Sequence, residues 1–166
     1  MTDVRASVES HLGSHDVSRV LYGTIVGLAL VLALEEHAHD PGQTAAFIFG
    51  TALAIGLADL FADAISLEAR TRTRLRRRDM RPLARDAVAV VIGAGFPAIY
   101  FVLAAIGVIG EHSAFTLAKW TGLVLVCTYA FLAARLAGLH WKHATRDAAI
   151  AGIVGVALVE LKALLH

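Results

Sequence analysis

The stretch TAAFIFGTALAIGLADLFADAISL, residues 44–67, decides the fold. Its only ionisable side chains are Asp59 and Asp63, and both lie in its second half. An α-helix needs about 20 apolar residues to cross about 30 Å of hydrocarbon, because it rises about 1.5 Å per residue. The stretch therefore predicts a membrane-spanning helix that carries two carboxylates.

Four further apolar stretches extend this pattern along the chain. The 166 residues are 57% hydrophobic and their mean hydropathy is +0.66, which is more apolar than a soluble domain. Pro97 predicts a kink in one of the spans. We expect an all-α polytopic membrane protein whose five transmembrane helices lie at residues 17–34, 44–67, 87–109, 115–139 and 148–165.

The basic residues indicate the orientation. When five spans are threaded through a membrane, 13 of the 15 Lys and Arg fall on the side of the amino terminus. Because basic loops remain in the cytoplasm, we expect the N-in, C-out topology of an integral protein in a bacterial plasma membrane. Residues 1–16 form either a cytoplasmic amphipathic helix, from the spacing of Val4, Val8 and Leu12, or a loosely ordered tail.

Arginine dominates the predicted cytoplasmic loop 70–86. Its basic side chains suit a topology anchor, and they also suit attraction to anionic lipid at about 1 kcal/mol each near the surface. No aromatic residues are interleaved with them, so we expect no nucleic-acid partner. The arginines at issue are Arg70, Arg72, Arg74, Arg76, Arg77 and Arg78, followed by Arg81 and Arg85.

Asp59 and Asp63 lie four residues apart and so share one helix face, with Ser66 three residues further on. Helix rise places Asp59 about 22 Å from the outer surface and Asp63 about 28 Å, near the inner interface. A buried carboxylate costs about 2.5–3.5 kcal/mol at a helix centre, so these side chains need a partner or a wet cavity. They form either a cation or proton path, to which Glu160 could contribute, or structural ion pairs. In the second reading Asp63 and Glu68 pair with Arg19 or loop arginines, and Asp59 pairs with a buried arginine.

A polar cluster follows the first span and offers oxygen and imidazole ligands that suit Mn²⁺, Fe²⁺ or Zn²⁺. Glu111, His112 and His166 fall on the same predicted outer side. The cluster is either an exit vestibule for divalent cations or a solvated acidic loop. Its members are Glu35, Glu36, His37, His39 and Asp40.

Gly23 and Gly27 are four residues apart in the first span, a spacing that lets two helix backbones approach closely. The pair predicts a dimer contact, although the same spacing also packs helices within one chain. Cys127 is the only cysteine, which excludes an intrachain disulfide.

Four stretches resemble the vacuolar iron transporter family. They are YGTIVGL at 22–28, LADLFADAISLE at 57–68, GFP at 95–97 and AARLAG at 133–138. The resemblance implies a five-span homodimer that exports Fe²⁺ or Mn²⁺ from the cytoplasm, often in exchange for protons. The chain departs from the family at Val26, where the family has a metal-binding aspartate, and at Leu67, where it has methionine. It also lacks the glutamate-rich metal-binding insertion that plant members carry between spans two and three.

The leading expectation is a homodimeric transporter that moves Fe²⁺ or Mn²⁺ along a polar path containing Asp59, Asp63 and Ser66. The alternative is a degenerate family member that no longer transports and acts as a membrane scaffold or interaction subunit. No nucleophile elbow, phosphate loop or paired haem ligand set occurs in the spans, so we expect neither enzyme activity nor a resident cofactor.

Overall fold

The computed structural model describes residues 14–35, 40–136, 138 and 140–164, and all regular secondary structure in these residues is α-helical. Three helices are long and apolar enough to cross a membrane, at Val17–Leu34, Pro41–Thr71 and Glu111–Arg135, and a bent helix pair makes four if it counts as one span. The helices are α2 (Ser14–Leu34), α3 (Pro41–Thr71), α4 (Arg77–Gly95), α5 (Ala98–Ala105), α6 (Glu111–Leu136) and α7 (Trp141–Leu164).

The apolar helices fit an integral membrane protein, as composition predicted. The predicted spans 17–34, 44–67 and 115–139 correspond to α2, α3 and α6, each with shifted ends. The predicted span 148–165 lies on α7, and whether that helix crosses a membrane stays a prediction. Residues 1–13, with the expected amphipathic segment, lie outside the described residues.

The predicted kink at Pro97 is confirmed. The third predicted span, 87–109, is a helix pair, α4 and α5, bent by 49° at a break between Gly95 and Ala98. Proline has no N–H to donate and its ring clashes with the preceding turn, so the helix changes direction there. Pro97 itself is buried in the bundle.

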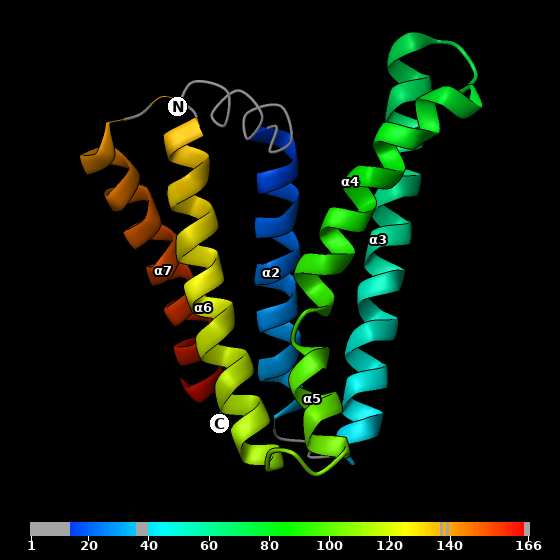
Figure 1. Cartoon of the computed structure of the whole chain (residues 1–166). Coiled ribbons are helices and arrows are strands. Elements are labelled where there is room, and N and C mark those ends of the chain that lie inside the picture. Colours follow the sequence, from blue (N-terminus) through cyan, green and yellow to red (C-terminus); the bar gives the residue numbers. More distant parts are fainter. Residues whose placement is uncertain (1–13, 36–39, 137, 139, 165–166) are drawn as a thin grey trace, which may run out of the picture.

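With the bent pair α4 and α5 counted as one, the helices alternate in direction along the bundle (Figure 1). α2 packs between α4 and α6, α3 packs on α4 and α5, and α7 packs mainly on α6. We call one end the arginine end, because it holds the start of α2, the α3–α4 connection and the start of α7 (Figure 1). The α2–α3 and α5–α6 connections lie at the opposite end.

Glycines bring α2 and α4 into close contact. A Cβ atom added at Gly23 would lie 2.3 Å from the carbonyl oxygen of Val90, and one at Gly27 would lie 2.7 Å from that of Ala94. On α4, a Cβ at Gly93 would lie 2.5 Å from the carbonyl oxygen of Val20. The two backbones therefore touch over more than one helical turn, as in other small-residue helix contacts.

A hydrophobic core closes the end of the bundle opposite the arginines. Val31 of α2, Ile48 of α3 and Phe101 of α5 are fully buried there. Phe101 meets Phe115 of α6 edge to face, with the ring centroids 4.7 Å apart, a favourable aromatic geometry. This core joins four helices around the short helix α5.

The predicted arginine loop 70–86 is mostly helical, which corrects the sequence prediction. α3 continues to Thr71 and α4 begins at Arg77, so that only residues 72–76 connect them. α3 has 31 residues, about 46 Å, and so extends beyond about 30 Å of hydrocarbon. We call residues 68–86 the arginine hairpin, which projects past α2 and α6 (Figure 1).

Candidate functional site

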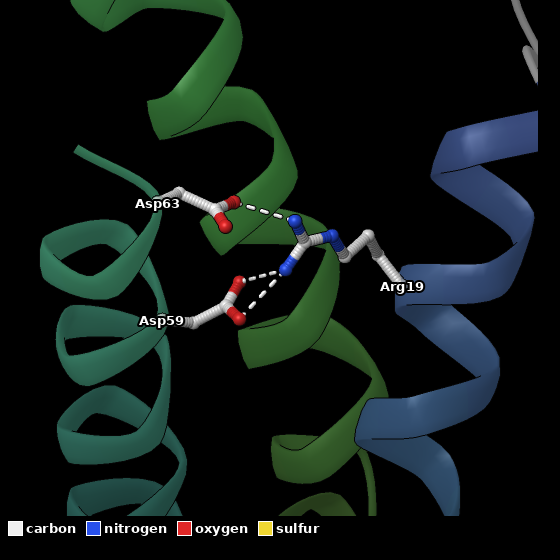
Figure 2. A network of polar contacts seen from close by, with 3 residues as sticks. All are labelled: Arg19, Asp59 and Asp63. Carbon is white, nitrogen blue, oxygen red and sulfur yellow. Dashed lines mark hydrogen bonds and ion pairs between the residues drawn. The ribbon is translucent and has the colours of Figure 1, made fainter. Parts of the chain in front are cut away.

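Arg19 of α2 reaches across to both carboxylates of α3 (Figure 2). Its Nη1 donates to both carboxylate oxygens of Asp59 at 2.6 Å, and its Nη2 donates to Oδ2 of Asp63 at 2.5 Å. The three side chains are 20%, 19% and 27% exposed, so the cluster is mostly shielded. Asp63 thus has the ion pair with Arg19 that the sequence left as one of two readings, and Asp59 shares the same arginine.

The packing stripe of α3 explains why the aspartates face inward. Ala45, Ile48, Ala52 and Gly56 are buried at helical spacing along the side of α3 that meets α4 and α5. A Cβ at Gly56 would lie 2.2 Å from Val91, so the two helices are close at this level. Asp59 and Asp63 continue the same stripe by one and two turns, and this carries both carboxylates toward α2.

A third carboxylate acts on the guanidinium. Asp86 of α4 is half-buried and interacts electrostatically with Arg19, in addition to Asp59 and Asp63. One arginine from α2 therefore lies among acids from α3 and α4. The two ion pairs link α2 to α3, two helices that otherwise make few contacts.

The arrangement is suited to holding helices together. Guanidinium has several N–H groups in a fixed fork, and charge-assisted bonds to carboxylates are about twice as strong as neutral ones. Arg19 uses two of its nitrogens on two acids one helical turn apart, which fixes both the distance and the rotation of α3 relative to α2. Within the described residues, no three His, Cys, Asp or Glu side chains are grouped in a way that would hold a metal ion.

The predicted outer metal cluster is divided by the structure. Nζ of Lys119 on α6 donates to Oε1 of Glu35 at 2.5 Å, which ties the end of α2 to α6. Asp40 caps α3, because its Oδ2 accepts from the backbone N–H groups of Gly42 and Gln43 at 3.1 and 3.3 Å. Of the other residues predicted on this side, Glu111 and His112 begin α6, and Glu36, His37, His39 and His166 lie outside the described residues.

Three other predicted residues have definite places. Ser66 is exposed on α3, one turn beyond Asp63. Gly23 and Gly27, predicted as a dimer contact, are both buried against α4 of the same chain. Glu160 belongs to α7, and its side chain lies outside the described residues.

Two polar contacts between spans were missed by the sequence reasoning. Lys119 and Glu35 are 84 residues apart, so no local sequence pattern brings them together. The hydroxyl groups of Tyr100 on α5 and Thr121 on α6 are 2.9 Å apart. Both contacts could have been sought from the sequence, because charged and hydroxyl side chains within a membrane need polar partners.

No protein-family model, curated protein or solved structure matches this chain. By its fold, the described part of the chain is all-helical, and three of its helices are long and apolar enough to cross a membrane. An ion-pair cluster centred on Arg19 joins two of these helices. The resemblance to vacuolar iron transporters rests on the four sequence stretches alone and stays a prediction.

Proposed function

We propose that the protein is a membrane scaffold or interaction subunit, in which the Arg19 cluster is a structural clamp. The observation that supports this function is the direct pairing of Arg19 with both membrane carboxylates, at 2.5 and 2.6 Å. A carboxylate already bound by an internal cation contributes to helix packing, and a transported cation would have to displace that arginine first. The clamp leaves the arginine hairpin projecting from one end of the bundle.

We further propose five spans, with the arginine end in the cytoplasm of a bacterium and the end of α7 outside. The alternating helix directions and the location of the arginine hairpin support this topology. Reporter fusions after residue 74 and after the last residue should give cytoplasmic and external signals respectively. Two signals from the same side would reject it.

Vesicle uptake tests the scaffold function against transport. Purified protein would be reconstituted in sealed vesicles, and Mn²⁺, Fe²⁺, Zn²⁺ and proton fluxes would be measured for the wild type and Asp59→Asn. We expect both proteins to match empty vesicles, with the variant still folded because Asp63 keeps its bond to Arg19. Saturable uptake by the wild type that Asp59→Asn abolishes would replace the scaffold by a transporter.

Transport of Fe²⁺ or Mn²⁺ remains the second candidate, because two carboxylates bind a single guanidinium and Asp86 adds a third negative charge that attracts it. Asp59 lies about 22 Å along α3 from Thr44, well inside a hydrocarbon layer of about 30 Å. In this mechanism an entering cation or proton binds a carboxylate and releases Arg19, which then acts as an internal counter-cation. The prediction specific to it is that Arg19→Gln alters proton coupling without abolishing cation binding.

A homodimer, as the family resemblance implies, would need a contact other than the buried pair Gly23 and Gly27. The exposed face of α3 offers small residues at every fourth position, Ala46, Gly50, Ala54, Ala58 and Ala62. Gly50→Leu combined with Ala54→Leu should weaken a dimer formed there, since bulky side chains keep backbones apart. Cross-linking in native membranes measures this, with Phe47→Leu as the control. An unchanged dimer would exclude this face.

A further inference from the structure

The arginine hairpin keeps its basic side chains exposed, and two of its acids, Glu68 and Asp79, accept backbone hydrogen bonds, while Asp79 also lies 3.8 Å from Nε of the exposed Arg78. Oε1 of Glu68 accepts from the backbone N–H of Leu75 at 3.0 Å, and Oδ2 of Asp79 accepts from that of Arg76 at 3.0 Å. These bonds hold the short connection between α3 and α4. All eight arginines of the hairpin are exposed: Arg70, Arg72, Arg74, Arg76, Arg77, Arg78, Arg81 and Arg85.

The hairpin begins directly beyond the apolar surface of the bundle. On the two helices that form the hairpin, the exposed large apolar side chains nearest to it are Ile65 of α3 and Val88 of α4, at 52% and 54% exposure. Helix rise puts Arg85 about 5 Å, Arg70 about 8 Å and Arg81 about 10 Å beyond them. The polar headgroup layer of a leaflet is about 5–7 Å thick, so these arginines reach the level of the lipid phosphates.

We propose that the arginine hairpin binds anionic phospholipid headgroups on the leaflet at the arginine end. Guanidinium groups bind phosphate oxygens through paired N–H groups, and an array of them at one depth contacts several headgroups together. Each basic residue near an anionic surface adds about five-fold to association. This inference rests on the proposed membrane insertion. It identifies anionic lipid as the partner of the arginine hairpin in the proposed scaffold.

The bilayer fits the hairpin better than a soluble anionic partner does. The hairpin is carried by α3 and by α4, which with α5 forms the bent candidate span, so membrane insertion brings these arginines to lipid at no further entropic cost of association. The connection of residues 72–76 projects further out and extends the basic surface above the headgroups (Figure 1). Lipid phosphate is therefore the first anion that the hairpin meets.

Lipid selectivity measured by electron paramagnetic resonance tests the proposal. The full chain would be reconstituted in phosphatidylcholine bilayers with trace spin-labelled phosphatidylglycerol or spin-labelled phosphatidylcholine. We expect the motionally restricted fraction to favour phosphatidylglycerol several-fold. The preference should shrink from about 0.1 M to about 1 M salt, as the Debye length falls from about 10 to about 3 Å.

Matched variants test whether the preference for phosphatidylglycerol comes from the arginine hairpin. Replacing Arg70 and Arg81 by Gln should remove much of the selectivity, whereas Lys142→Gln with Arg146→Gln, at the start of α7, should leave most of it. Equal losses from the two pairs, or no preference in the wild type, would overturn the proposal. A preference abolished by soluble RNA would assign the hairpin to nucleic acid instead.

The same spectra separate this inference from the membrane insertion on which it rests. If the helices do not enter the bilayer, neither spin-labelled lipid shows a restricted component. If both lipids are restricted equally, the bundle is inserted and the lipid proposal alone fails. Uptake of metal by the same vesicles would reject the scaffold function without altering the lipid preference.

Discussion

Helix α2 makes two different contacts with its neighbours. With α4 it forms a steric contact, in which Gly23, Gly27 and Gly93 let the two backbones touch. With α3 it forms an electrostatic contact, in which one arginine spans the gap to Asp59 and Asp63. The first contact depends on glycines, which have no side chain, and the second depends on charged side chains that reach across the gap.

The difference lies in what each contact tolerates. A steric contact between backbones has almost no free space, so even one added methyl group requires a helix to move. An ionic contact keeps its geometry only while its charges are balanced, because removing one partner leaves a charge without compensation. The two contacts should therefore respond to different substitutions, by different amounts.

The largest effect is expected at the glycine contact. Gly23→Ala should destabilise the bundle by about 3 kcal/mol, since the new Cβ atom would lie 2.3 Å from the backbone oxygen of Val90. Gly50→Ala is the matched control, because nothing lies within 4 Å of a Cβ at that position. It should be neutral or stabilise α3 by up to about 1 kcal/mol. Unfolding in mixed micelles measures both, and equal losses would contradict the close contact.

A smaller loss is expected when the ionic contact is broken. Arg19→Met removes the cation and leaves Asp59 and Asp63 close together with no guanidinium. Exposed ion pairs contribute about 0–1 kcal/mol, and breaking fully buried ones costs about 3–5 kcal/mol. Because these side chains are about one-fifth exposed, we expect a loss of about 2 kcal/mol in the same unfolding assay. Wild-type stability in this variant would show that the pairing is incidental.

The smallest effect is expected at the hydroxyl pair between α5 and α6. Tyr100→Phe removes the hydrogen bond to Thr121, whose oxygen is 2.9 Å away, and keeps the ring in place. A single hydrogen bond contributes about 0.5–1.5 kcal/mol net, so a loss of about 1 kcal/mol is expected. If Thr121→Val costs nothing further in the Tyr100→Phe background, the two hydroxyls act as a pair. Additive losses would mean that each has another partner.

Much of the helical order was predictable from the sequence. Apolar stretches long enough to span a membrane marked α2, α3 and α6, and Pro97 marked the break between α4 and α5. The arginine hairpin was taken for a loop, although Arg and Leu are good helix formers and Pro82 lies only five residues into α4. The density of charge indicated that the hairpin lies at the surface, and the helix propensity of its residues indicated that its backbone is helical.

The partners of the polar residues were harder to predict. A helix that is apolar all round gives no sign of which side packs, so Gly23 and Gly27 fitted an intrachain contact as well as a dimer. Pairing of Arg19 with the aspartates was one of two alternatives, because spacing places Asp59 and Asp63 on one face without identifying their neighbour. Lys119 and Glu35 needed the packing of α2 against α6, which no local pattern contains.

We infer that Arg19, Asp59 and Asp63 form one structural clamp. The most direct measurement is the free energy of unfolding of Arg19→Met compared with that of Arg19→Met/Asp59→Asn/Asp63→Asn. The clamp predicts that the uncharged triple variant regains most of the roughly 2 kcal/mol lost in the single variant, because no carboxylate remains uncompensated. A triple variant less stable than Arg19→Met would contradict it, since the aspartates would then stabilise the protein without Arg19.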